Sequence, residues 1–303
     1  MPKYRYLKMV CTPQSSKPKL DPKFKPSIIE KQVVNTIKEY GLFLKKDKVL
    51  VACSGGKDSS VILHILHKLG YIVEAITVNA HIGCYSDQNL ENLKILCSSL
   101  DVKLHEIPFR KEFGRSLCYI QDVLKEKGHN FTSCHTCGVL RRYLLNKHSR
   151  RIKPAVIVTG HNLDDEAQAV MMNLLRGHMN IAARTGPRTG LIKHAKFVSR
   201  VKPLYFVEEK DIVQYSLFYK FAINYEDCPC SSEAYRKDMK KVVAGVEKLG
   251  LKTKLNIVKS FLRILPKLKK KYMTAEKLKS CELCGEPTNK NICNTCNLLI
   301  KIR

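Results

Sequence analysis

The feature that most constrains the fold of this chain is a short glycine-containing segment, SGGKDS, at residues 54–59. It lies between an apolar run at residues 48–52 and a stretch at residues 58–69 whose apolar residues have helical spacing. This order predicts a strand, a tight turn and a helix, and two adjacent glycines let successive backbone N–H groups converge in such a turn. The helix adds unpaired N–H groups and the positive end of its dipole. The segment therefore predicts an anion-binding loop.

The other residues of this loop favour a phosphate ligand over an empty turn. Lys57 supplies a positive charge, and Ser54 and Ser59 supply hydroxyl donors. The spacing is neither that of a Walker A motif nor that of a dinucleotide-binding turn. It resembles the pyrophosphate-binding loop (PP-loop) of the ATP pyrophosphatases, which implies that the loop holds the pyrophosphate end of ATP. A glycine turn without a ligand is the alternative.

The pattern after this loop alternates between strands and helices. Further strands are expected at residues 71–78, 102–107 and 155–159, and helices at residues 87–100, 117–127, 138–147 and 164–175, with an earlier helix from an N-cap at Ser27 to Gly41. This alternation predicts an α/β fold with a doubly wound parallel sheet, which binds its ligand at the carboxyl ends of the strands. The SGGKDS loop follows the first strand and so lies at that edge.

The composition indicates a polyanionic partner. Lys and Arg number 54 against 27 Asp and Glu, which gives a formal net charge of +27. Such an excess favours binding to RNA or DNA. A membrane surface is the rival, but no apolar run is long enough to span a bilayer and no long basic amphipathic helix stands out. We therefore expect a cytoplasmic protein with no membrane partner.

We divide the chain into four segments. A basic arm at residues 1–26 precedes a catalytic domain at residues 27–245, a basic helical linker at 246–272 and a zinc-binding module at 273–303. The linker contains the run KLKKK, for which a solvated surface and RNA contact are both open.

The C-terminal module carries two CxxC pairs separated by eight residues. Two such turns can place four thiolates in a tetrahedron around one zinc ion, and a segment too small for its own core gains its fold from the metal. The predicted zinc ligands are Cys281, Cys284, Cys293 and Cys296.

A second set of cysteines lies in the middle of the chain. Cys134 and Cys137 form a CxxC that opens a helix, and Cys228 and Cys230 follow far downstream. A helix N-terminus and nearby arginines favour thiolates, so we expect the first pair to be ionised. Three thiolates suit a 4Fe-4S cluster with one open iron. A four-cysteine zinc site and a redox dithiol remain alternatives.

The remaining cysteines are isolated in the sequence. Cys53 is expected as a small residue at a strand end, and Cys11, Cys84, Cys97 and Cys118 are expected to pack. Since the count of 13 is odd and several cysteines form close pairs, a disulfide framework is unsuited to this chain.

A further motif, TGHNLDDEAQ at residues 159–168, stands where a strand meets a helix. Gly160 allows the backbone to approach a nucleotide, and Asp164 or Asp165 can hold Mg²⁺ against phosphates. The alternative is that these acids cap the helix.

These motifs, in this order, resemble the TtcA/TtuA group of PP-loop tRNA 2-thiouridine synthetases, and in particular the archaeal and eukaryotic-cytosolic NcsA branch. The resemblance runs from about residue 27 to the C-terminus. It implies an adenine nucleotide alpha hydrolase-like fold, with an iron–sulfur cluster on Cys134, Cys137 and Cys228. The ATP-binding positions that it implies are Cys53, Ser54, Gly55, Gly56, Ser59, His81, Arg141 and Gly160, and the catalytic positions are Lys57, Asp58 and Asp165. Members of this group usually open with a zinc knuckle of paired cysteines. Only Cys11 stands in that region, so we expect no N-terminal zinc.

The resemblance implies adenylation of the C2 oxygen of a tRNA uridine, favouring the wobble position 34 over position 54, followed by sulfur insertion. It implies ATP, Mg²⁺, zinc and a 4Fe-4S cluster as cofactors. The partners would be tRNA, a sulfur donor (sulfide or a sulfur-carrier protein) and a second copy of the chain. A cysteine persulfide is the competing sulfur route. The alternatives are another PP-loop tRNA-modifying enzyme (cytidine thiolation or lysidine-like) with structural zinc only, and a non-catalytic RNA-binding metalloprotein.

Overall fold

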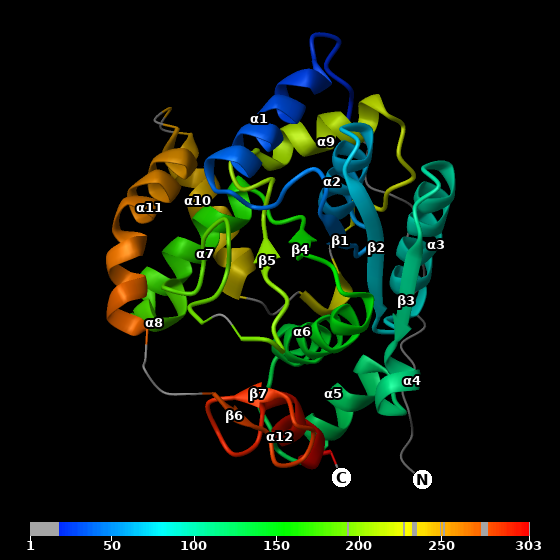
Figure 1. Ribbon diagram of the computed structural model, residues 1–303, viewed down its shortest axis with the longest axis vertical. Coiled ribbons are helices and arrows are strands. Elements are labelled where there is room, and N and C mark those ends of the chain that lie inside the picture. The colour runs from blue at the N-terminus through cyan, green and yellow to red at the C-terminus, as the bar shows by residue number, and fades with distance from the viewer. Residues whose placement is uncertain are drawn as a thin grey trace.

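A parallel β-sheet with strand order β3-β2-β1-β4-β5 lies at the centre of the computed structural model (Figure 1). The structure describes residues 18–192, 194–226, 228–231, 235–248, 250, 252–273 and 278–302. The strands are β1 (Lys48–Ala52), β2 (Ile72–Asn79), β3 (Leu104–Pro108), β4 (Val156–Thr159) and β5 (Arg200–Val201). All neighbours in this sheet are parallel, which confirms the predicted doubly wound α/β class.

The helices are α1 (Pro26–Glu39), α2 (Lys57–Lys68), α3 (Gly83–Ser99), α4 (Phe109–Phe113), α5 (Leu117–Glu126), α6 (Ser133–Ile152), α7 (Leu163–Leu175), α8 (Met179–Ala182), α9 (Glu209–Phe218), α10 (Tyr235–Glu247), α11 (Thr253–Tyr272) and α12 (Asn294–Ile300), with a 3₁₀ turn η1 at Pro229–Ser231. The first helix begins at Pro26 with Lys25 as its N-cap, so the expected N-cap at Ser27 is wrong. Proline is favoured at the first helical position because its missing N–H would be unpaired there. Among the described residues, no helix is long and apolar enough to cross a membrane.

Helices cover both faces of the sheet because successive residues of each buried strand point in opposite directions. On one face, Val49 and Val51 pack with apolar residues of α1, α2, α3 and α9. On the other, Leu50 packs with residues of α4, α5 and α6. Both faces of β1 are therefore apolar, as expected for the central strand of a parallel sheet.

The ligand-binding edge of this sheet follows from its topology. The chain passes from β1 to β2 and β3 in one direction, and β4 then pairs with the opposite side of β1. The strand order thus reverses between β1 and β4, and in open α/β sheets ligands bind at this reversal. Ala52 lies opposite Thr159, so the SGGKDS loop and the Gly160 motif start side by side.

A smaller helical layer of α7, α10 and α11 lies beside the sheet (Figure 1). The helix α11 occupies most of residues 246–272, the segment that we expected as a basic helical linker. Its apolar face packs on α7 and α8 through Val258, Phe261 and Leu265. The segment is therefore a packed part of the fold as well as a basic one.

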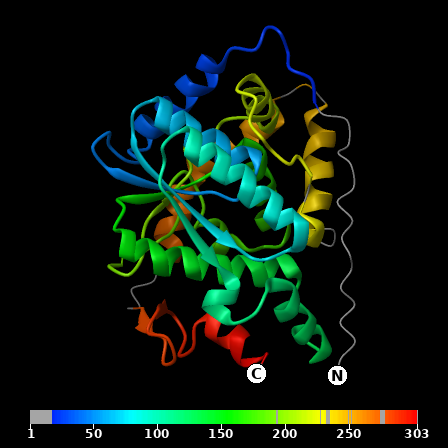
Figure 2. The ribbon, with the colours of Figure 1, turned by 90° about the vertical axis from the view of Figure 1, so that its right-hand side faces the viewer.

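The C-terminal module contains a short antiparallel pair, β6 (Lys279–Ser280) and β7 (Pro287–Thr288), followed by α12. It lies against α6 on the side away from the sheet (Figures 1 and 2). Leu298 of α12 is buried in the same core as residues of α5 and α6. The module is thus fixed to the helix that begins with the mid-chain CxxC.

Candidate ATP and metal sites

The loop after β1 has a backbone shape that requires glycine. Gly55 has a φ of +80°, and a Cβ at this position would lie 2.1 Å from the backbone oxygen of Asn89. The hydroxyl of Ser59 accepts from the Ser54 N–H at 3.1 Å and donates to the Gly56 carbonyl at 3.0 Å. Ser59, in the first turn of α2, therefore holds the loop closed through these two hydrogen bonds.

The two charged residues of the loop are held by partners from distant segments. Lys57 Nζ lies 2.8 Å from Glu209 Oε1 and 3.2 Å from Asp58 Oδ2. Burial opposes the charged form of Lys57, but the two carboxylates outweigh it and raise its pKa above the ordinary value. The other oxygen of Asp58 accepts a hydrogen bond from Asn162 Nδ2 at 2.8 Å. Glu209 and Asn162 were absent from the predicted site because their contacts join segments more than a hundred residues apart.

The loop after β4 lies directly against this turn. A Cβ on Gly160 would lie 2.8 Å from both Asp58 C and Ser59 N, so the backbone approaches α2 as closely as a glycine permits. Asn162 and Asp165 form a capping box at the start of α7, and Arg236 also pairs with Asp165 at 3.2 Å. Asp165 thus caps the helix with Oδ2, while its Oδ1 lies beside Arg236.

The other acid of the motif, Asp164, connects helices of the fold. Asp164 Oδ1 lies 2.7 Å from Lys254 Nζ, and Oδ2 accepts from the Glu209 N–H at 2.7 Å. It therefore ties α7 to α9 and α11. Asp58 and Asp165 are near enough to interact: burial raises the pKa of Asp58, Lys57 opposes this rise, and the charge of Asp165 adds to it. A cation between the two carboxylates would relieve both rises in the pKa of Asp58.

Two further predicted ATP contacts have buried nitrogen atoms without partners among the described residues. His81 follows β2 with a φ of +54°, and its Nδ1 is buried and unpaired. Arg141 lies on α6, and its Nε is also buried and unpaired. Because a buried donor or acceptor without a partner is costly, both atoms fit positions that a ligand completes.

The mid-chain cysteines come together around the start of α6. Cys134 and Cys137 stand in its first turn, which Thr132 caps by accepting from the His135 N–H. Cys228 precedes η1, which packs on α6. Its charge contributes to the pKa of both helical thiols. The three predicted cluster ligands are therefore near one another.

The expectation that Cys134 and Cys137 are ionised is wrong for the thiols without a metal. Burial raises the pKa of both, and the charge of Cys228 adds to it. Arg236 lowers the pKa of Cys134, and Arg141 lowers that of Cys137, but each effect is smaller than the rise caused by burial. Desolvation thus exceeds the effect of the neighbouring cations on both thiols.

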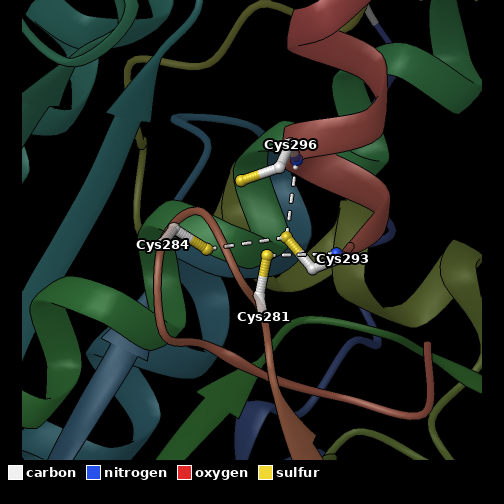
Figure 3. Close-up of side chains that lie close together, drawn as sticks. All are labelled: Cys281, Cys284, Cys293 and Cys296. Carbon is white, nitrogen blue, oxygen red and sulfur yellow. Dashed lines mark hydrogen bonds between the residues drawn. The ribbon is translucent and has the colours of Figure 1, made fainter. Parts of the chain in front are cut away.

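The C-terminal cysteines form a compact site (Figure 3). Cys281, Cys284, Cys293 and Cys296 place their sulfur atoms within 4.8 Å of one another. The Cys293 N–H donates to Cys281 Sγ at 3.3 Å, and Gly285 has a φ of +69° at the turn after the first pair. Burial opposes the Cys281 thiolate, but backbone N–H groups outweigh it and lower its pKa to about 6. Four clustered sulfurs with this support fit a single zinc ion.

The mid-chain set is wider than this zinc site. Within the described ranges, only the C-terminal group brings three or more such ligand atoms within 4.8 Å of one another. Sulfurs around one zinc ion are close because each Zn–S bond is only about 2.3 Å long. A larger cluster therefore suits Cys134, Cys137 and Cys228 better than a second zinc ion does.

Two other cysteines differ from the expectation that they pack. Cys84 and Cys118 are exposed, whereas Cys53 and Cys97 are buried as expected. Cys118 hydrogen-bonds with Cys230, which lowers the pKa of Cys118 to about 7. Cys11 lies outside the described residues, so the expected lack of an N-terminal zinc stays a prediction.

A polar contact holds the zinc module against α6. Arg150 forms a two-pronged ion pair with Glu286, with one distance of 2.7 Å, and Asn146 Nδ2 also donates to Glu286. Lys196 Nζ donates to the Gly285 carbonyl at 2.8 Å. The module is thus bound to α6 by its metal-binding turn.

Comparison with known proteins defines the class. The model of the PP-loop domain family matches residues 26–239, and the chain belongs to this family. Within it, the chain belongs to the tRNA 2-thiolation group. The tRNA-5-methyluridine(54) 2-sulfurtransferase of Pyrococcus horikoshii is 35% identical over 267 residues, which span 88% of this chain and 83% of that protein. Cytoplasmic tRNA 2-thiolation protein 1 of Aspergillus niger is 31% identical, spanning 90% and 79% of the two chains.

A solved structure agrees with these relatives. The U34-tRNA thiolase NcsA from Methanococcus maripaludis, determined with its 4Fe-4S cluster, has a TM-score of 0.74 to this chain. It is 26% identical, and the match covers 90% of this chain and 86% of that one. The family resemblance inferred from the motifs is therefore confirmed.

Proposed function

We propose that this chain is an ATP-dependent tRNA 2-sulfurtransferase that replaces the C2 oxygen of a uridine by sulfur. The observation that carries the proposal is the meeting of three elements at one edge of the sheet. These are the SGGKDS loop, the Gly160 motif that lies against it, and the cysteines around the start of α6, which Arg236 connects to the motif by pairing with Asp165 and lowering the pKa of Cys134. Relatives named as tRNA 2-thiolation proteins support the substrate class.

The first chemical step requires binding and charge neutralisation at the loop. Backbone N–H groups of the loop and the α2 N-terminus hold the leaving pyrophosphate, and Lys57 neutralises charge that develops on it. Asp58 and Asp165 are the residues that would hold Mg²⁺. Attack of the uridine C2 oxygen on the α-phosphorus then yields an adenylated base, from which AMP can leave.

The second step needs a sulfur atom near the activated base. Cys134, Cys137 and Cys228 would hold a 4Fe-4S cluster, and a cluster with three protein ligands supplies an iron with an open position for sulfide. Cys134 and Cys137 are held by α6, whose apolar residues share a core with those of α5, and Cys228 precedes the turn η1 that packs on α6. A persulfide on Cys134 or Cys228 is the alternative sulfur source.

The target position, the sulfur donor and the assembly are further parts of the proposal. We favour the wobble uridine, which the name of the solved relative supports, while the Pyrococcus relative is named for position 54. Sulfide or a sulfur-carrier protein would supply sulfur, and a homodimer would be the active form. The name of the Aspergillus relative supports a cytoplasmic location.

The iron content of cysteine variants tests the cluster. After anaerobic purification we expect a brown protein with an iron–sulfur absorbance band. The variants C134A, C137A and C228A each lose iron and colour, because each removes one of only three ligands. The variant C230A is the matched control and keeps both. A colourless wild-type protein that holds only zinc would contradict the sulfur-transfer proposal, and iron loss in C230A would contradict the ligand choice.

A further inference from the structure

Two arginines near the end of β4 have no carboxylate partner among the described residues. Arg142 lies on α6 and Arg200 on β5, and Arg200 Nη2 donates to the Arg142 carbonyl at 3.0 Å. Burial lowers the pKa of both, and that of Arg200 falls to about 10 with Arg142 as its other cause. Cys137 lies near Arg142 and opposes this shift only in its thiolate form.

Two neighbouring cations, Lys202 and Arg236, each have a carboxylate partner, in contrast to the two arginines. Lys202 Nζ lies 2.6 Å from Glu166 Oε1, and Arg236 pairs with Asp165 at 3.2 Å. Because crowded charges without a partner are costly, a fold normally pairs them as it does here for Lys202 and Arg236. The two unpaired guanidinium groups therefore indicate a missing anion.

The geometry directs the arginine pair toward the reaction centre. A Cβ on Gly138 would lie only 3.0 Å from Arg142 Nη1, so the guanidinium folds back over the first turn of α6 and lies near Cys137. Part of Arg142 reaches solvent, although the atoms packed around its guanidinium lower its pKa, and Arg200 is half-buried with its Nε unpaired. A phosphate group from solution can thus reach Arg142 and Arg200.

The position of His161 relates the pair to the ATP loop. His161 follows Gly160, whose backbone lies against Asp58 and Ser59. Burial, followed by the charges of four surrounding cations that include Arg200 and Arg142, lowers the pKa of His161 to about 3. Both arginines are therefore near His161, and Arg142 is also near Cys137.

We propose that Arg142 and Arg200 bind a phosphate group of the substrates, a role that the sequence motifs do not assign to them. The inference rests on the proposed function, since both substrates of that reaction carry phosphates. A guanidinium fork is suited to phosphate because it can donate two parallel hydrogen bonds. The phosphate is either the α-phosphate of ATP or a backbone phosphate next to the target uridine, and binding measurements distinguish the two.

The test compares three probes on the full-length variants R142Q and R200Q: ATP, inorganic pyrophosphate and an unmodified tRNA transcript. If the phosphate belongs to ATP, the Kd for ATP rises about 10- to 100-fold, as expected for charge-assisted hydrogen bonds, while that for pyrophosphate is unchanged. If it belongs to RNA, the Kd for tRNA rises and the slope of log K against log salt falls by about one, while ATP binding is unchanged.

Three controls separate phosphate binding from a structural role. R110Q removes an exposed arginine of α4 and is expected to change no Kd. R200K keeps the charge but cannot donate two parallel hydrogen bonds, so it is expected to restore only part of the lost affinity. The ligand-free glutamine variants should melt no lower than the wild type, because they remove unpaired charge.

Unchanged Kd values for both ATP and tRNA would overturn the inference. If the melting temperature also fell, the arginines would have a structural role only. None of these measurements requires sulfur transfer. A protein that binds both substrates through these arginines but transfers no sulfur would contradict the proposed function and support the inference.

Discussion

The close approach of Gly160 to the PP-loop gives the sharpest prediction about the ATP site. In the variant G160A, the new Cβ would lie 2.8 Å from two backbone atoms of residues 58 and 59, whereas ordinary contacts begin at 3.4 Å. The two loops must therefore separate by about 0.6 Å, the difference between these distances. Both neighbours are backbone atoms, so no side-chain rotation can relieve the contact.

Strain of this kind costs about 1–3 kcal/mol. It can displace the loop, which weakens ATP binding by about 5- to 150-fold, or lower the stability of the fold by the same free energy. We expect the first outcome to dominate, because residues 54–59 are less buried than the strand β4. The assay is calorimetric titration with ATP, together with thermal unfolding.

The variant G245A is the matched control for this prediction. Gly245 lies in the exposed part of α10 with no atom within 4 Å of an added Cβ, so alanine there should stabilise the helix by about 0.5–1 kcal/mol and leave ATP binding unchanged. Wild-type affinity and wild-type melting temperature in G160A would refute the geometric argument.

Three further predictions test other parts of the molecule. D58N should abolish ATP-dependent pyrophosphate release while the protein still binds tRNA, and wild-type release in a coupled pyrophosphate assay would exclude Asp58 from the reaction. C284S should lose zinc, measured by mass spectrometry of the metal content, and should melt at a lower temperature; equal zinc content would contradict the four-cysteine site. Burial opposes the Glu112 carboxylate, but Lys147 and His148 outweigh it and lower its pKa below 4.5, so the stabilisation is present above that pH and is lost as the pH falls through the lowered value. The melting temperature of E112Q should therefore fall less than that of the wild type as the pH is lowered through this range. An equal fall in both proteins would contradict this.

Local patterns were sufficient to predict four strands of the sheet and the C-terminal metal-binding turns, while β5 was missed. Apolar runs placed β1 at its observed residues and β2, β3 and β4 within two residues of theirs. Two CxxC pairs gave a four-cysteine cluster in the C-terminal module, since the ligands lie within one short segment. Such features depend on residues that are near one another in the sequence.

The features that the sequence did not predict depend on long-range packing. The ion pair of Lys57 with Glu209, and that of Asp165 with Arg236, join residues from different helices and have no spacing signal. The raised pKa of Cys137 was missed because local cations were visible in the sequence while desolvation by the folded chain was not. The start of α1 differed because Pro26 itself serves as the first helical residue.

The central claim is that ATP activation and sulfur transfer occur at one site, and in vitro thiolation tests it most directly. Anaerobically purified protein with its cluster would be incubated with unmodified tRNA, ATP, Mg²⁺ and sulfide, and the tRNA nucleosides would then be analysed by mass spectrometry. The account predicts 2-thiouridine that requires ATP and is lost in the D58N and C228A variants. Absence of thiolated nucleoside from a fully loaded protein that binds both ATP and tRNA would contradict it.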